Sequence, residues 1–268
     1  MKKDWIAAVA AVVLLVLAAA GLWWWVEGRK PVPPAALPPA ATAPPPVVAL
    51  APSEPAIRYP VEVPVAASAP QALDAALAEV FGRKAVLGLF QLQDFPRRFV
   101  ATVDNLGRAQ APVRMWPLNP VGSRFGVDRR DGGEQVAASN AARYAPYVQL
   151  IESVDLRQVA TLYARLYPQL QQAYEELGYP KRYFNDRLVE VIDQLLATPE
   201  PEGPLKVHLP AIAVPVKPER PWVLYEFDDP ALQSLSAGQR VLLRMGAANE
   251  QRVKVRLTEF RHLITRRP

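Results

Sequence analysis

The chain has 268 residues, with 31 Lys or Arg against 26 Asp or Glu and a formal net charge of +5 at pH 7. Half of the residues are hydrophobic and 21% are charged, which excludes a wholly disordered or fibrous protein. The absence of cysteine excludes disulfides, thiolate metal ligands, cysteine nucleophiles and a lipid-modified cysteine. With only His208 and His262, the chain has no multi-histidine metal centre, and we expect neither a metal nor a cofactor.

An uncharged run from Trp5 to Val26 predicts a transmembrane helix at residues 5–26, within an N-terminal anchor of residues 1–30. As a helix this run is about 33 Å long, against a bilayer core of about 30 Å. Tryptophans, which prefer the membrane interface, stand at both of its ends. A cleaved signal peptide is the alternative, because residues 18–21 fit a small-residue cleavage pattern. The apolar run continues past that point, which favours an anchor in the lipid bilayer.

Residues 31–70 predict a disordered linker, because 13 prolines and 11 alanines fill 24 of the 40 positions. Such a composition cannot bury enough apolar surface to fold, and it favours extended polyproline II conformations. Either a semi-rigid spacer or a featureless tether fits this segment.

Residues 71–268 predict one compact, globular, mainly helical domain with a small β component. Capping residues and apolar periodicity predict short helices after Asp229 and Ser236 and longer helices at 73–81, 85–91, 94–107, 139–152, 155–177, 185–197 and 249–265. Alternation and β-branched residues predict strands at 123–128, 134–137, 205–209 and 222–227.

A row of tyrosines on one helix is the first candidate site. Tyr163, Tyr167 and Tyr174 share a helical face with Leu170. A tyrosine-rich groove binds sugar rings or peptides, because each ring stacks and each hydroxyl forms a hydrogen bond. The alternative is that these rings pack between helices in the core.

Polar residues in apolar helices form the second candidate site, with Arg143 and Arg187 as possible ligands of a carboxylate or phosphate. The alternative is that these arginines, with Asp104, Asn140 and Asp193, pair across elements and fix their register. The predicted binding face therefore comprises Tyr163, Tyr167, Tyr174, Arg143 and Arg187.

Support for catalysis is weak, so the sequence favours a non-enzymatic protein without deciding the matter. The neighbouring carboxylates Glu175-Glu176 and Asp228-Asp229 suit a glycosidase in principle, but Asp229 also suits a helix cap. The chain lacks the common hydrolase, metalloprotease and phosphate-loop motifs. The basic last helix either docks on the domain or contacts an anionic surface. A net charge of only +4 from residue 71 onward does not favour nucleic acid as a partner.

Several short strings resemble, as a set, a proteobacterial membrane-anchored family called domain of unknown function 3014. They include Asp104-Asn105-Leu106, Tyr163-Ala164-Arg165-Leu166-Tyr167-Pro168, Phe184-Asn185-Asp186-Arg187-Leu188, Tyr225-Glu226-Phe227-Asp228-Asp229-Pro230 and Ser236-Ala237-Gly238-Gln239-Arg240. The resemblance covers about residues 73–263. It implies no activity and no site residue, but the layout of one span, spacer and soluble domain fits the family.

Two functions follow as hypotheses. The first is a single-pass protein of the bacterial inner membrane whose periplasmic C-terminal domain is a non-catalytic scaffold that binds an envelope protein. The second is a peptidoglycan- or glycan-binding protein, or a hydrolase, that uses the tyrosine-rich face and a carboxylate on a cell-wall polymer. Nucleic acid is not an expected partner of either.

Overall fold

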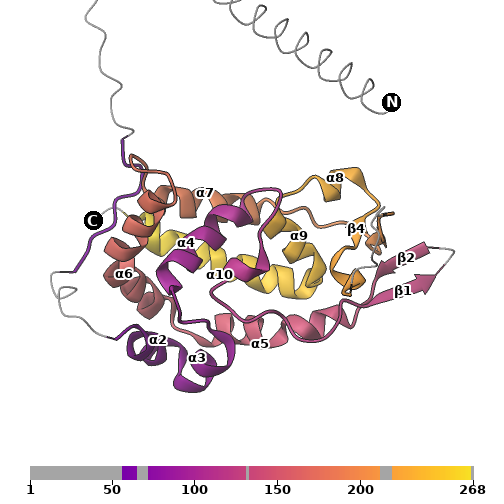
Figure 1. Cartoon of the computed structure of the whole chain (residues 1–268), viewed down its shortest axis with the longest axis horizontal. Coiled ribbons are helices and arrows are strands. Elements are labelled where there is room, and N and C mark those ends of the chain that lie inside the picture. Colours follow the sequence, from indigo (N-terminus) through magenta and orange to yellow (C-terminus); the bar gives the residue numbers. More distant parts are fainter. Residues whose placement is uncertain (1–55, 65–71, 131–132, 212–218, 267–268) are drawn as a thin grey trace, which may run out of the picture. The chain divides into compact units, whose positions relative to one another are not determined.

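The computed structural model describes residues 56–64, 72–130, 133–211 and 219–266 (Figure 1). The predicted transmembrane helix at 5–26 and most of the predicted linker lie outside these residues. Among the helices in the described ranges, none combines the length and apolar character that a membrane crossing requires.

The described domain is mainly helical, as predicted, with a small β component. Its longer helices each start or end within about three residues of a predicted helix. They are α2 (Leu73–Phe81), α3 (Arg83–Leu89), α4 (Phe95–Leu106), α5 (Asn140–Ser153), α6 (Leu156–Glu176), α7 (Phe184–Leu196), α9 (Ala237–Arg244) and α10 (Ala247–Thr265). A four-residue helix, α8 (Pro230–Gln233), and two 3-10 turns, η2 (Val113–Met115) and η3 (Pro221–Val223), complete the helical elements of the described ranges.

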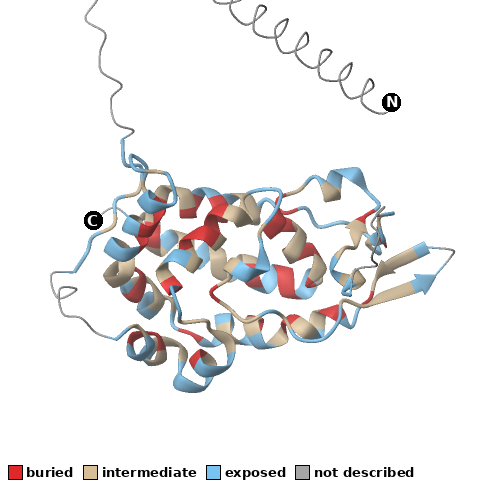
Figure 2. Ribbon diagram, in the orientation of Figure 1, coloured by how far each residue is buried: buried red, intermediate tan, exposed pale blue. Residues whose placement is uncertain are grey.

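The last long helix, α10, organises the bundle, because it packs against α5, α6, α7 and α9 (Figure 1). The main core lies between α4, α6, α7 and α10 and includes Val100, Leu170, Phe184 and Ile192, each at most 2% exposed. Figure 2 shows buried residues concentrated along these central helices, whereas the β1–β2 hairpin is intermediate or exposed. Burial of these apolar faces provides the main driving force for the fold.

Side-chain caps define where several helices begin. The Asp155 carboxylate accepts a hydrogen bond from the backbone N–H of Arg157 at 2.8 Å, at the start of α6. Ser236 and Gln239 form a reciprocal capping box at the start of α9. Asp229 accepts from the backbone N–H of Ala231 at 2.8 Å, so this carboxylate caps α8, as its position before Pro230 predicts.

A small antiparallel sheet of strand order β1-β2-β3-β4 lies at one end of the bundle. Its strands are β1 (Val127–Arg130), β2 (Gly133–Val136), β3 (Lys206–His208) and β4 (Glu226–Phe227). The predicted strand at 123–128 was placed too early, since only its last two residues belong to β1. The predicted strand at 222–227 was also wrong over most of its length. Pro221 starts a 3-10 turn there, in which the N–H of Leu224 bonds to the Pro221 carbonyl, so only Glu226 and Phe227 join the sheet.

Residues 56–64, at the end of the predicted linker, lie against α7 and belong to the same compact unit as the bundle. The backbone N–H groups of Arg58 and Tyr59 donate to the two carboxylate oxygens of Asp186 at 3.1 and 2.9 Å. The amide of Asn185 donates to the Tyr59 carbonyl at 2.9 Å. We call residues 56–64 the strap. Its position could not be predicted from composition, because it depends on Asn185 and Asp186, which are more than 120 positions away in the sequence, and on the packing of Tyr59 and Val61 against the core.

Candidate functional site

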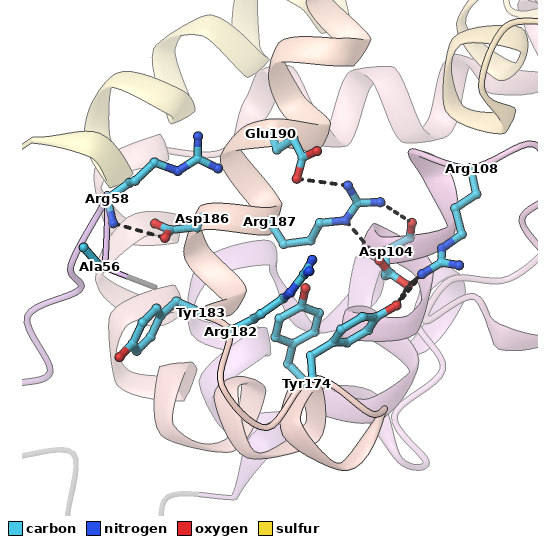
Figure 3. Close-up of a pocket in the computed structure, with 11 residues that line it drawn as sticks. Ala56, Arg58, Asp104, Arg108, Tyr174, Arg182, Tyr183, Asp186, Arg187 and Glu190 are labelled. Carbon is cyan, nitrogen blue, oxygen red and sulfur yellow. Dashed lines mark hydrogen bonds and ion pairs between the residues drawn. The ribbon is translucent and has the colours of Figure 1, made fainter. Parts of the chain in front are cut away.

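A cavity of about 450 Å³ opens where the end of α4, the end of α6, the start of α7 and the strap meet (Figure 3). We call it the Asp104 pocket. Four arginines, three carboxylates and three tyrosines supply nearly all of its lining: Arg58, Arg108, Arg182, Arg187, Asp104, Asp186, Glu190, Tyr174, Tyr179 and Tyr183. Ala56 completes it.

Asp104 is the fixed centre of this pocket, with a side chain only 6% exposed. Arg187 Nε donates to Asp104 Oδ1 at 3.0 Å, and Arg187 Nη2 donates to the Asp104 carbonyl oxygen at 3.0 Å. Arg108 Nη2 donates to Asp104 Oδ2 at 2.8 Å. The Tyr179 hydroxyl lies 3.3 Å from the same oxygen and also contacts Arg108. Charge-assisted hydrogen bonds of this kind hold the buried carboxylate in place.

Arg187 remains a cation although its side chain is only 17% exposed. Burial lowers the pKa of this guanidinium, but the hydrogen bond and charge of Glu190, together with Asp104, outweigh burial and raise the pKa above its usual value. Arg187 Nη1 lies 3.1 Å from Glu190 Oε2. Arg187 therefore connects a buried carboxylate to one at the surface.

Tyr174 forms the floor of the pocket and is 2% exposed. Its ring stacks on that of Tyr179, with 4.6 Å between the ring centroids and 22° between the planes. Burial, together with the nearby Asp104 charge, raises the pKa of the Tyr174 phenol to about 12. The hydroxyl is therefore neutral at physiological pH and suits hydrogen bonding rather than proton transfer.

Two arginines of the pocket are free to bind a ligand. Arg58, on the strap, and Arg182, before α7, are both exposed, and neither guanidinium has a hydrogen-bonded or ionic partner in the described part of the chain. The carboxylate of Asp186, between them, is already held by two backbone N–H groups. Planar guanidinium groups bind carboxylates and phosphates in bidentate fashion. The pocket therefore presents two guanidinium groups that can bind an anion, beside polar side chains that are fixed by hydrogen bonds.

The structure brings two of the five predicted site residues together, since Tyr174 and Arg187 line the Asp104 pocket. The Tyr163 hydroxyl donates to Asn185 Oδ1 at 3.0 Å inside the core, and the Tyr167 hydroxyl donates to Gln171 at 3.2 Å. Burial of its ring raises the pKa of Tyr167 to about 12. The tyrosine row therefore packs between helices, as its alternative interpretation predicts.

Arg143 lies away from this pocket, at the start of α5. Its Nε donates to the Gly122 carbonyl at 3.1 Å, and its Nη1 donates to Asn140 Oδ1 at 3.2 Å. Arg143 thus holds the loop before the sheet. The pairing of polar residues across elements, which was one of the two interpretations, is confirmed for Asp104 with Arg187, whereas Arg143 bonds to Asn140 of its own helix and to a loop carbonyl.

Sequence reasoning missed Arg58, Arg108 and Arg182. A signal for Arg182 exists, because it lies in a short basic loop between Tyr179 and Tyr183 that joins two helices. Arg58 is the only basic residue in the range 31–70, which singles it out within an apolar segment. Neither signal shows that the two arginines meet, since that depends on the hydrogen bonds of the strap.

The basic last helix, α10, docks on the bundle through its cations. Arg252 pairs with Glu152 of α5, and Arg261 Nη2 donates to Asp193 Oδ2 of α7 at 3.0 Å. Lys254 Nζ donates to the Thr198 carbonyl at 2.7 Å. These contacts join α10 to two neighbouring helices and to the loop after α7. Within the described ranges, no group of three or more histidine or acidic residues is arranged to hold a metal ion.

The family model described as "Protein of unknown function (DUF3014)" matches residues 95–261. The chain belongs to the DUF3014 family. The DUF3014 match runs from α4 into α10, so it includes every lining residue of the Asp104 pocket except those of the strap. The helices α2 and α3 precede it. Comparison with curated proteins found no match, and comparison with solved structures found none.

Proposed function

We propose that this DUF3014 protein is a membrane-anchored, non-catalytic interaction protein of the bacterial cell envelope, with its helical domain in the periplasm. In this proposal the domain recognises an anionic group of an envelope partner at the Asp104 pocket. The observation that carries the proposal is a pair of guanidinium groups, Arg58 and Arg182, that have no partner among the described residues and lie beside a pocket base fixed by Asp104 and Arg187.

The state of the pocket carboxylates supports binding rather than catalysis. Asp104 accepts from two arginines, Asp186 accepts from two backbone N–H groups, and Glu190 pairs with Arg187. A general acid or base needs an oxygen that is free to exchange a proton with the substrate. Both oxygens of Asp104 and of Asp186 are instead used to position the pocket, and Glu190 is a surface carboxylate that pairs with Arg187 through one oxygen.

The uncharged run at 5–26 and the proline-rich segment after it support the membrane-anchored part of the proposal. A spacer in a polyproline II conformation extends by about 3.1 Å per residue, so it allows the domain to contact a partner some distance from the bilayer. A reporter fused to the C-terminus tests this arrangement. We expect activity from a reporter that works only in the periplasm, and activity of a cytoplasm-specific reporter would contradict the proposal.

A cell-wall polymer is the second candidate partner, and the tyrosines of the pocket favour it. Tyr179 and Tyr183 line the pocket beside the two free arginines, so aromatic stacking and carboxylate binding are available at one site. The full-length protein is tested by cosedimentation with purified cell-wall sacculi. Loss of cosedimentation in a double variant, Arg58→Ala with Arg182→Ala, supports the polymer. No cosedimentation of the wild-type protein at low salt excludes it.

A further inference from the structure

The strap is attached to the bundle over a small area. Of its nine residues, only Tyr59 and Val61 pack against the main core, and the other seven are exposed. Asp186 accepts hydrogen bonds from two N–H groups of the strap backbone, and Asn185 donates to the Tyr59 carbonyl. Segments with few buried apolar contacts open at a lower free energy than the whole fold. The strap can therefore detach from α7 while the bundle remains folded.

The strap supplies one of the two arginines of the Asp104 pocket that have no partner among the described residues. Arg58 and Ala56 line the pocket from the strap, whereas every other lining residue belongs to α4, α6, α7 or the turns beside them. With the strap docked on α7, the lining holds four arginines and three carboxylates. Without the strap, three arginines face three carboxylates, so the lining loses its net positive charge.

Asp186 makes the effect of the strap on anion binding larger than the loss of one cation. This carboxylate also lines the pocket, and both of its oxygens accept from N–H groups of the docked strap (Figure 3). Once the strap detaches, those two hydrogen bonds are lost. Arg182 and Asp186 line the same pocket four positions apart, so the freed carboxylate can pair with this guanidinium. Detachment of the strap therefore removes Arg58 and also occupies the second cation of the site.

We propose that the strap is a switch for anion binding at the Asp104 pocket: docked on α7 it completes the site, and detached it leaves the anion without either guanidinium. This inference rests on the proposed function, because it concerns the regulation of the same site. An anion bound by Arg58 and Arg182 joins the strap to the loop before α7. By linkage, the anion stabilises the docked strap by as much as docking strengthens anion binding. Each of the two events can therefore be measured through the other.

Calorimetry and hydrogen exchange of the full-length protein in phosphatidylcholine nanodiscs test this switch. The probe is inorganic pyrophosphate, and sodium chloride at the same ionic strength is the reference. Calorimetry gives the dissociation constant of pyrophosphate, which Arg182→Ala should raise at least about tenfold. At about nine times the dissociation constant, exchange of the Arg58 and Tyr59 amides should slow about tenfold, because the anion binds only the docked state.

Two variants separate the charge of the strap from its docking. Arg58→Ala keeps the backbone N–H groups that bond to Asp186, so the strap stays docked, but pyrophosphate should no longer slow the exchange of its amides. Tyr59→Ala changes no lining residue of the pocket, yet it removes the packing of the strap on the core. It should weaken pyrophosphate binding at least as much as Arg58→Ala does. Adding Arg58→Ala to Tyr59→Ala should then weaken binding less than Arg58→Ala does in the wild-type protein.

Matched controls and the possible outcomes keep the test decisive. Arg157→Ala, at an exposed position outside the pocket, and Val63→Ala, at a 41% exposed position of the strap, should both bind pyrophosphate as the wild-type protein does. Val61→Ala replaces Tyr59→Ala if circular dichroism shows that the latter variant has lost its helices.

Pyrophosphate binding that depends on Arg182 but neither slows the strap amides nor responds to Tyr59→Ala overturns the switch and leaves the proposed function standing. Absence of binding, or binding that Arg182→Ala does not weaken, overturns the anion site and the switch together.

Discussion

Asp104 and Arg187 are 83 positions apart in the sequence, and their side chains join α4 to α7 at 3.0 Å between Oδ1 and Nε. The same guanidinium reaches the Asp104 carbonyl, so one arginine satisfies both the side chain and the backbone at the end of α4. This pair therefore fixes the base of the Asp104 pocket. Arg58 and Arg182, which have no partner among the described residues, line the same pocket.

Replacement of Asp104 by alanine should destabilise the domain strongly. Arg187 would then keep a largely buried charge without its buried partner, which typically costs about 3–5 kcal/mol. The free energy of unfolding, measured by urea denaturation, provides the test. Glu190→Ala is the matched control, because Glu190 is 57% exposed and its pair with Arg187 should contribute only about 0–1 kcal/mol. Equal effects of the two substitutions would contradict the central role of Asp104.

The Tyr163 hydroxyl should contribute to stability through Asn185. Asn185 is fully buried, and its oxygen accepts from Tyr163 while its amide donates to the carbonyls of Tyr59 and Ile264. Tyr163→Phe leaves that oxygen unsatisfied, at a cost of about 1–3 kcal/mol in the free energy of unfolding. Tyr167→Phe removes a hydroxyl from a half-buried position and should cost less. The reverse order of the two effects would refute this assignment.

Asp186 should hold the strap in place. Asp186→Ala removes the two hydrogen bonds to the N–H groups of Arg58 and Tyr59, each contributing about 0.5–1.5 kcal/mol. Hydrogen exchange of these two amides should therefore accelerate about tenfold or more, while exchange in the centre of α7 is unchanged. Glu190→Ala, on the same helix but paired with Arg187, is the control and should leave both amides protected.

Gly238 marks a point where α9 approaches its neighbours closely. A Cβ at this position would lie 2.6 Å from a methyl group of Leu195 and 3.0 Å from the carbonyl oxygen of Leu106. Gly238→Ala should therefore lower the free energy of unfolding by about 1–3 kcal/mol. Gly88→Ala, in α3, meets no atom within 4 Å and should raise it by about 0.4–1 kcal/mol. Thermal and urea denaturation of both variants measure the difference between their free energies of unfolding.

The buried tyrosines should make the fold sensitive to alkaline pH. Burial raises the pKa values of Tyr167 and Tyr174 from 10.0 to about 12, so the folded state retains protons that the unfolded state releases. Stability from these groups is complete below pH 10 and falls as the pH rises from about 10 to about 12. In Tyr167→Phe the free energy of unfolding should fall less between pH 10 and pH 12 than in the wild-type protein. Below pH 10 the two proteins should show the same dependence of stability on pH. Urea unfolding across this range provides the measurement, and an unchanged fall would contradict the assigned shift.

Helices and caps were predictable from the sequence because their signals are local. Asp155 and Ser236 precede apolar periodicity, and their side chains bond within one turn of the chain. The strand at 222–227 was mispredicted because β propensity depends on pairing partners, and Pro221 turned the chain before the pairing began. The Asp104 pocket was only partly predictable. Arg187 stood out among apolar residues, whereas Arg58 reaches the pocket through hydrogen bonds to a helix more than 100 positions away.

Crosslinking in living cells tests the central claim most directly, namely that the Asp104 pocket binds an anionic group of an envelope partner. The full-length protein carries a C-terminal tag, and the species that copurify are identified by mass spectrometry. The pocket variant combines Arg58→Ala with Arg182→Ala. The control combines Arg114→Ala with Arg157→Ala, two exposed arginines outside the pocket.

We predict that one envelope partner crosslinks to the wild-type protein and to the control, and that the pocket variant loses it while retaining its thermal stability. The same partner crosslinked equally to all three proteins would contradict the account.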